Sequence, residues 1–285
     1  MIMQNTQFLL VGLGLIGGSY AIALKKHGMQ VAAIDTDQKA IDYALEKGII
    51  DEGKTYPDEA IIKKADFVVF GLYPKTLVEW VKKHAHLLKS GAFLTDVSGV
   101  KCQIVDEIQG ALRPDVEFFA SHPMAGREVS GVQNSTDTMF TAANFILTPT
   151  DRNTKEGEQK LVNLAQILGF KHVTTLSPSE HDKMVGFVSQ LTHVIAVSLM
   201  NCKDNPSLCE YTGDSFRDLT RIANINEALW SELFLLNRDI LLEEIDHFVQ
   251  EVEHLKETLS RGDEQGLKEL FIQSTQRRKV FDKPI

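Results

Sequence analysis

A histidine stands where an apolar run meets a loop, in the stretch from Ala120 to Glu128 that reads ASHPMAGRE. An imidazole has a pKa of about 6.5, so it can accept a proton at neutral pH and act as a general base. Pro123 disfavours a helical backbone at His122 and holds that residue extended at the end of a predicted strand. The sequence therefore offers His122 as an acid/base group, and the alternative is a histidine that only closes a strand.

A glycine-rich turn follows the first apolar run and opens a predicted helix; it reads GLGLIGG at residues 12–18. Gly12 permits a tight turn, Gly14 lets the backbone approach a pyrophosphate, and Gly17 allows the helix to pack closely on the strand. The start of the helix, at Leu15 and Ile16, offers free amides and a partial positive charge to phosphates. This context predicts a dinucleotide-binding turn.

Asp35 lies 21 residues after Gly14, at the end of the second predicted strand. A carboxylate at this place accepts hydrogen bonds from a ribose 2′-hydroxyl and repels a 2′-phosphate. The three residues that follow, Thr-Asp-Gln, include no arginine to receive such a phosphate. The sequence therefore predicts NAD as cofactor and disfavours NADP.

The first half of the chain has the pattern of a doubly wound α/β domain of the Rossmann type. Short apolar runs alternate with amphipathic stretches, which predicts a parallel sheet covered on both faces. The predicted strands are residues 7–11, 31–34, 67–72, 92–95, 116–120 and 145–147. Ligands bind beyond the carboxyl ends of such strands, so the further cofactor-binding candidates are Leu72, Pro74 and Asp96.

The second half is predicted to be helical. The composition turns polar at residues 150–154, which sets predicted domains of 1–152 and 153–285, with one more helix and a short strand at 171–176. The apolar middle of the helix that begins near residue 178 predicts deep burial. A helix over 227–260 carries a narrow apolar seam, which requires a partner from the helix at 263–280 or from a second subunit.

Composition excludes several classes of protein. The net charge is −9 and no basic stripe is interleaved with aromatic residues, which argues against a nucleic-acid partner. Three widely spaced cysteines, Cys102, Cys202 and Cys209, predict reduced thiols and no metal site. No cationic leader and no run of about 18 apolar residues is found, so we expect a cytoplasmic protein without a membrane partner.

Five separated motifs carry a specific resemblance: the glycine turn, TDVSGVK at 95–101, HPMAGRE at 122–128, EHDKMVGFVSQLTH at 180–193 and FRDLTRIANINEALW at 216–230. Together they resemble the prephenate/arogenate dehydrogenase family of tyrosine biosynthesis. The resemblance implies a Rossmann-type domain followed by an all-helical dimerisation domain. It also implies NAD-dependent oxidative decarboxylation of prephenate to 4-hydroxyphenylpyruvate by a homodimer.

Other functions remain open from the sequence. Arogenate is the nearest alternative substrate, either alone or in a dual-specificity cyclohexadienyl dehydrogenase. A β-hydroxyacid dehydrogenase has the same two-part organisation but uses a lysine motif that this chain lacks. The non-enzymatic alternative is a dinucleotide-binding sensor that has lost its chemistry.

The resemblance assigns roles to residues of two motifs. It makes His122 the base that deprotonates the substrate ring hydroxyl, and Gly126 belongs to the same motif. Arg221 matches the arginine that binds a substrate carboxylate, for which a planar guanidinium is suited. The alternative for Arg221 is a surface ion pair with Asp218 or Glu227, and Arg127 is a lesser candidate for the carboxylate.

The helical half supplies the remaining expected substrate contacts. His181 and His193 match family positions around the substrate, the alternatives being a helix cap for His181 and a core histidine for His193. Gln190 stands where the family usually has a histidine. Trp230 matches a tryptophan donated across the dimer interface, with a core tryptophan as the alternative.

The motif after the fourth predicted strand departs from the family pattern. Many relatives have a serine immediately before Val-Lys, where it orients the catalytic histidine. This chain has Gly99 at that place and Ser98 one residue earlier. Either Ser98 takes over this role through a shifted turn, which glycine permits, or water does.

Overall fold

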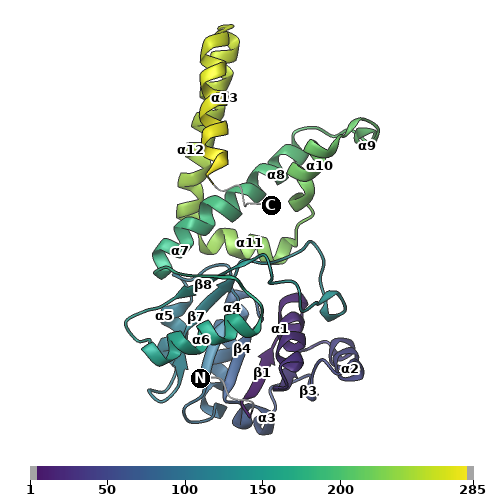
Figure 1. Ribbon diagram of the computed structural model, residues 1–285, viewed down its shortest axis with the longest axis vertical. Helices are drawn as coiled ribbons and strands as arrows, with labels where there is room; N and C mark the ends of the chain where they lie inside the picture. The colour runs from purple at the N-terminus through teal and green to yellow at the C-terminus, as the bar shows by residue number, and fades with distance from the viewer. Residues whose placement is uncertain (1–4, 281–285) are drawn as a thin grey trace.

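The computed structural model describes residues 5–280 and has a lower α/β part and an upper helical part (Figure 1). A six-stranded sheet in the order β3-β2-β1-β4-β5-β6 forms the centre of the lower part, and all of its strand pairs are parallel. The strands are β1 (Gln7–Val11), β2 (Gln30–Ile34), β3 (Glu52–Lys54), β4 (Phe67–Phe70), β5 (Phe93–Asp96) and β6 (Glu117–Phe118). This confirms the predicted doubly wound domain.

Alternate residues of the strands pack against different helices. Phe8 and Leu10 of β1 belong to the core on one face, which is covered by α1 (Leu15–Lys26), α2 (Gln38–Glu46) and α6 (Lys155–Ile167). Leu9 and Val11 belong to the core on the other face, covered by α3 (Glu59–Lys64), α4 (Pro74–His84) and α5 (Val105–Ala111). Because both faces are buried, the strands are apolar throughout instead of alternating with polar residues.

A second, smaller sheet corrects the predicted strand set. Its order is β7 (Ala120–Pro123), β8 (Asn144–Thr148), β9 (His172–Thr175), with β7 antiparallel and β9 parallel to β8. The predicted strand 145–147 therefore lies outside the parallel sheet, and the predicted strand 116–120 divides between β6 and β7. Strand β3 was not predicted, because its three residues, Glu-Gly-Lys, contain no apolar run.

Helix α6 and strand β9 pack with the nucleotide-binding part. Leu161 and Leu164 of α6 are completely buried in the same core as β1, and β9 pairs with β8. The polar stretch at 150–154 is thus a surface turn within this part. We therefore propose a division near residue 176, in place of the boundary expected between residues 152 and 153.

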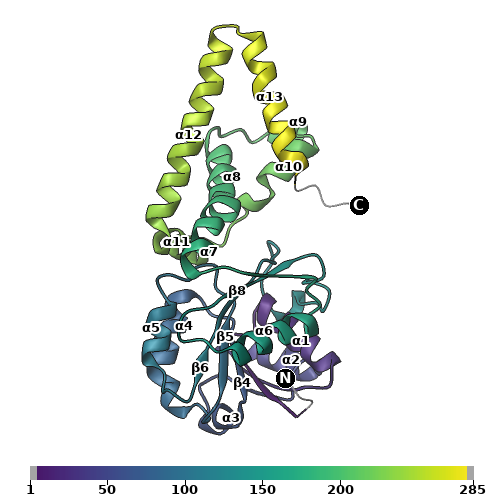
Figure 2. The same ribbon diagram turned by 60° about the vertical axis from the view of Figure 1, so that its left-hand side comes forward.

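The upper part consists of helices, two of which form a hairpin that projects away from the sheets (Figures 1 and 2). They are α7 (Pro178–Val185), a π-helical segment (Gly186–Leu191), α8 (Thr192–Asn201), α9 (Leu208–Tyr211), α10 (Asp214–Thr220), α11 (Glu227–Leu236), α12 (Arg238–Ser260) and α13 (Glu264–Lys279). The hairpin is α12 with α13. The predicted helix 227–260 breaks at Asn237, where φ is −116° and the side chain is buried and hydrogen-bonded.

The predicted deep burial of the helix that begins near residue 178 is wrong for the single chain. Phe187 is 58% exposed and Val188 is 47% exposed. Among the described residues, the segment Pro178–Asn201 is the one helix long and apolar enough to cross a membrane, judged by length and composition. An apolar helix that its own chain leaves uncovered needs another surface to pack against.

Candidate active site

The backbone around His122 is fixed by a buried polar network at the ends of β5 and β7. The amide of Ser121 donates to Asp96 Oδ1 over 3.1 Å, and the hydroxyls of Thr95 and Ser121 lie 2.8 Å apart. Lys101 Nζ donates to the Ser121 carbonyl over 2.7 Å. The amide, hydroxyl and carbonyl of Ser121 are therefore all hydrogen-bonded, which fixes the position of the backbone from which the His122 side chain extends.

Asp96 and Lys101 form an ion pair with a 2.7 Å contact, and both side chains are completely buried. The same Asp96 carboxylate also accepts the amide of Ser98. The prediction of Asp96 as a cofactor-binding residue is corrected by this arrangement, because its oxygens face inward and are used by the protein. Burial lowers the pKa of Lys101, against the opposing effect of Asp96.

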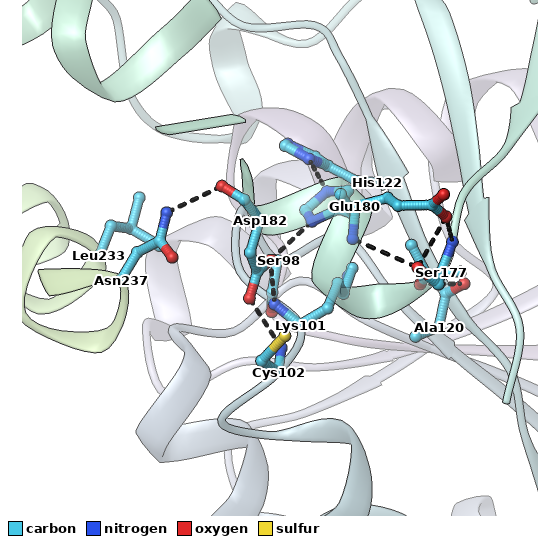
Figure 3. Close-up of polar contacts among 12 residues, drawn as sticks. Ser98, Lys101, Cys102, Ala120, His122, Ser177, Glu180, Asp182, Leu233 and Asn237 are labelled. Carbon is cyan, nitrogen blue, oxygen red and sulfur yellow. Dashed lines mark hydrogen bonds and ion pairs between the residues drawn. The ribbon is translucent and has the colours of Figure 1, made fainter. Parts of the chain in front are cut away.

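His122 belongs to a chain of side chains that ends on a carboxylate. Its Nδ1 lies 2.9 Å from Nε2 of His181, and Nδ1 of His181 lies 2.7 Å from Oδ1 of Asp182. Figure 3 shows His122 and Asp182, the two ends of this hydrogen-bonded series. His122 comes from β7 and the other two residues from α7, so the helical part completes the surroundings of the candidate base.

Asp182 also anchors the loop that follows β5. Its Oδ1 accepts the amide of Lys101 and its Oδ2 accepts the amide of Cys102, each over 2.8 Å. Burial alone raises the pKa of Asp182, but hydrogen bonds from His181 and from the Cys102 amide outweigh it, so the net shift is downward. The side chain is consequently a carboxylate at neutral pH.

His122 and His181 are both held in the neutral form. Burial, followed by the charges of His181 and Lys101, moves the pKa of His122 well below its ordinary value. Burial also lowers the pKa of His181, although the hydrogen bond to Asp182 works against it. A neutral imidazole has a lone pair on one nitrogen, which is the form that a general base requires.

The expected contact between Ser98 and His122 is not present. The Ser98 hydroxyl is buried and has no hydrogen-bond partner among the described residues. Gly99 lies beside the histidine: a Cβ built on it would be 3.8 Å from His122 Cε1 and 3.6 Å from the methyl groups of Leu233. The polar contact of the His122 ring is made by its Nδ1 with His181 instead.

Two predicted substrate contacts are corrected. His181 is 0% exposed and both of its ring nitrogens are engaged, so it supports His122 and does not face a substrate. Gln190 is 1% exposed and bonds the side chain of Asn237 and the carbonyl of Leu233. Asn237 in turn donates to the Asp182 carbonyl, and thus the break between α11 and α12 is tied to α7 (Figure 3).

Arg221, on the turn after α10, reaches the loop that follows His122. Its guanidinium forms an ion pair with Glu128, not with the Asp218 or Glu227 considered as alternatives. The arginine side chain is 61% exposed. A cation that remains accessible beside the HPMAGRE loop is free to exchange its carboxylate partner, which Arg127, bonded to the Asn134 carbonyl, is less suited to do.

His193 and Trp230 stack on one another at the same level of the helical part. Their ring centroids are 3.5 Å apart and the ring planes are inclined by 29°. His193 Nδ1 lies 2.9 Å from the Ser189 carbonyl, and both residues are half-buried. Burial lowers the pKa of His193, whose surroundings include the charges of Glu128 and Arg221, so these four residues lie in one neighbourhood.

The glycine turn has the shape that a dinucleotide needs. Gly12 has a φ of 98°, and a Cβ on it would lie 2.5 Å from the Gly71 carbonyl oxygen. A Cβ on Gly17 would lie 2.1 Å from the Gly12 oxygen, whereas one on Gly14 would meet nothing within 4 Å. Close packing at two glycines and open space at the third fit a pyrophosphate lying over Gly14, at the start of α1.

The other predicted cofactor residues surround this turn. The Asp35 carboxylate accepts the amide of Leu13 over 2.6 Å and that of Asp37 over 2.9 Å, which orients it at the end of β2. A methyl group of Leu72 lies 3.2 Å from the Cβ position of Gly12, and Pro74 is the first residue of α4. Gly126 is exposed in the loop after His122.

Asp182, Lys101, Glu128 and Leu233 were missed as site residues by sequence reasoning. The first three belong to motifs already quoted, so the signal was their position in those motifs. No local pattern distinguishes Leu233, which contributes to the site by packing.

Comparisons with known proteins agree over nearly the whole chain. Family models described as prephenate dehydrogenase, nucleotide-binding domain, and prephenate dehydrogenase, dimerization domain, match residues 20–174 and 177–273. Prephenate dehydrogenases from Bacillus subtilis and Lactococcus lactis are 31% and 30% identical; the alignments cover 94% and 97% of this chain and 74% and 77% of those proteins. Prephenate dehydrogenase from Aquifex aeolicus, solved with hydroxyphenyl propionate and NAD+, has a TM-score of 0.89 at 32% identity, with 99% of each chain covered.

Proposed function

Because the chain belongs to the prephenate dehydrogenase family, we propose that it catalyses the NAD-dependent oxidative decarboxylation of prephenate to 4-hydroxyphenylpyruvate. The observation that carries this proposal is the neutral His122 at the carboxyl end of the sheet, with its Nδ1 engaged by His181. The reaction consumes prephenate and NAD+ and yields 4-hydroxyphenylpyruvate, CO2 and NADH. Loss of CO2 makes the ring aromatic, which makes the reaction effectively irreversible.

The residues around the glycine turn would hold the cofactor. Amides at the start of α1, near Leu15 and Ile16, suit the pyrophosphate, and Asp35 suits an unphosphorylated ribose. When bound, NAD+ supplies the acceptor for the hydride that leaves the substrate carbon. The carboxylate at Asp35 would repel a 2′-phosphate, so we propose NAD as the preferred cofactor.

His122 would remove the proton of the substrate ring hydroxyl through Nε2, which accepts no hydrogen bond within residues 5–280. A positioned general base typically contributes about 10²–10⁴-fold to a rate. Burial is the main cause that lowers the pKa of His122 and keeps the resting imidazole neutral, and the nearby Lys101, which bonds the Ser121 carbonyl, adds to it.

Arg221 would bind one of the two substrate carboxylates in place of Glu128. Its exposure and its present carboxylate partner support this role, because a guanidinium that pairs with a protein carboxylate can also bind a substrate carboxylate. His193 and Gly126 are proposed to line the substrate space, as the resemblance predicts. Trp230 was expected to reach the site of a neighbouring subunit, whereas its stacking on His193 of the same chain supports a place beside its own substrate space.

We propose that two copies of the chain associate through the helical part. Large apolar side chains on α11, α12 and α13 are exposed in the single chain; they include Leu235, Leu242, Val252, Leu259 and Phe271. Burying one such side chain gains about 1.5–3 kcal/mol, so a second copy has a strong reason to cover them. The cysteines are exposed and unpaired, which supports a reducing, cytoplasmic location.

The proposal is tested by mixing the purified protein with NAD+ and either prephenate or arogenate and following NADH. We expect prephenate-dependent NADH formation with release of CO2, and slower turnover with NADP+. A His122→Asn variant should lose most of kcat and keep its affinity for NAD nearly unchanged. Turnover of arogenate alone would change the assigned substrate, and no turnover of either compound would contradict the proposal.

A further inference from the structure

We infer that the pair His181–Asp182 selects the tautomer of His122 in this chain, which is the orienting task expected of a serine in the loop after β5. The inference rests on the proposed function, because it concerns how the base of that reaction is prepared. His181 is a positioning residue here: it touches His122 and is completely buried away from solvent.

The direction of each hydrogen bond in the series His122–His181–Asp182 follows from the state of Asp182. The Asp182 carboxylate receives two backbone amides, from Lys101 on Oδ1 and from Cys102 on Oδ2, and therefore acts only as an acceptor. Nδ1 of His181, 2.7 Å from Oδ1, must then carry the proton of that contact. In a neutral ring this leaves a lone pair on Nε2 of His181.

That lone pair decides the state of His122. Nε2 of His181 lies 2.9 Å from Nδ1 of His122, so Nδ1 donates and Nε2 of His122 keeps the free electron pair. The ring nitrogen that bears a proton is set by the hydrogen bond of the other nitrogen. Asp182 thus acts through His181 to direct the basic nitrogen of His122 away from α7.

Among the described residues, those of the β5 loop and of α11 near His122 provide no polar contact that competes for this task. Ser98 has a buried hydroxyl without a partner, and Gly99, the residue beside His122 Cε1, has no side chain. Leu233, also next to Gly99, contributes only methyl groups. The polar contact that fixes His122 therefore comes from the helical part.

The first test reads the tautomer directly and needs neither substrate nor cofactor. The chain has nine histidines, so ¹⁵N-histidine NMR of the intact protein is assigned for His122 by comparison with His122→Asn. We expect the proton on Nδ1 and an unprotonated Nε2 in the wild-type protein. A proton on Nε2 of His122 would overturn the inference, whatever the enzyme turns over.

The second test replaces His181 by one of two amides: one is placed to keep the contact with His122, and the other can keep only the contact with Asp182. In His181→Gln, the amide oxygen is placed to accept from His122, whereas in His181→Asn, the shorter amide can reach Asp182 but not His122. We expect kcat for prephenate to fall on the order of 10–100-fold in His181→Asn and much less in His181→Gln, by analogy with the loss of a partner that orients a metal-binding histidine. KM and NAD affinity should change little in either variant.

The two outcomes of the variant pair are distinct. Equal losses of kcat in both variants would reduce His181 to a packing residue, and no loss in either would remove it from the mechanism. If the wild-type protein turns over no cyclohexadiene at all, the proposed function fails while the NMR measurement still decides the tautomer. The NMR measurement also decides the inference if either variant does not fold.

Discussion

Replacing Lys101 by methionine should destabilise the nucleotide-binding part by about 3–5 kcal/mol, because it leaves Asp96 as a buried charge without its cation. The pair is separated by 2.7 Å, and neither side chain is exposed. Methionine has a similar length and keeps the packing of the stem, so the variant tests the charge. In the variant, the Ser121 carbonyl also loses the hydrogen bond from Lys101 Nζ, which contributes about 1 kcal/mol of the expected effect.

The remaining partners of Asp96 place the effect toward the lower end of this range. Its carboxylate keeps the amides of Ser98 and Ser121, at 2.9 and 3.1 Å, and these partly stabilise the negative charge. The double variant Asp96→Asn with Lys101→Met should lose less than Lys101→Met alone, since no unpaired charge is then buried.

Urea unfolding at neutral pH measures the free energies of unfolding, and thermal melting gives an independent reading. A loss of 3–5 kcal/mol corresponds to a shift of roughly 6–20 °C for domains of this size. Lys89→Met is the matched control, because Lys89 pairs with Asp66 at the surface and its loss should cost under about 1 kcal/mol. The reasoning is refuted if Lys101→Met unfolds with the free energy of the control, or if the double variant is no more stable than Lys101→Met.

Three other predictions concern the proton, the substrate and the cofactor. Because His122 and His181 have a pKa below the ordinary 6.5, the folded chain binds fewer protons than the unfolded chain just below about pH 6.5. The free energy of unfolding, measured by urea titration, should therefore fall as the pH drops through that window. In pH–rate profiles, kcat/KM should fall only at the lower pH where His122 itself is protonated. Arg221→Ala should mainly raise KM for prephenate, while Arg217→Ala, on the exposed side of α10, should leave it unchanged; equal KM values in steady-state assays would argue for a surface ion pair. Gly14→Ala should fold normally and bind NAD more weakly in a fluorescence titration. Gly12→Ala should lose thermal stability, because Gly12, unlike Gly14, has a positive φ and a carbonyl oxygen 2.5 Å from the Cβ position.

The parallel sheet and the glycine turn were predictable because local patterns specify them. Runs of four or five apolar residues separated by amphipathic stretches have few alternatives to a sheet covered on both faces. The second sheet was not predictable in the same way. Its strand β8 looks like any buried strand, and only its antiparallel pairing with β7, which depends on the path of residues 124–143, separates it from the main sheet.

Burial in the helical part was predicted wrongly for a related reason. An apolar sequence indicates that a helix will be covered, but it does not say by which chain. Phe187 and Val188 are exposed here because the surface that would cover them is not part of the same subunit in our proposal. Hydrophobicity alone indicates that this helix needs a cover, and in our proposal a second copy of the chain supplies it.

The order of Ser98 and Gly99 shows that a residue's position in a motif does not by itself establish its role, here the orienting of His122. A serine one residue from its expected place keeps its chemistry, yet its hydroxyl here is buried without a partner, and the turn directs a glycine at His122. What holds His122 comes from α7, a segment 59 residues away along the chain. The contact requires Asp182 to bind the amides of Lys101 and Cys102, which docks α7 on the β5 loop and sets the position of His181 at the same time. A sequence can list these residues, but the hydrogen bond between the two histidines exists only after that docking, because it depends on the distance between two elements and not on the pattern within either.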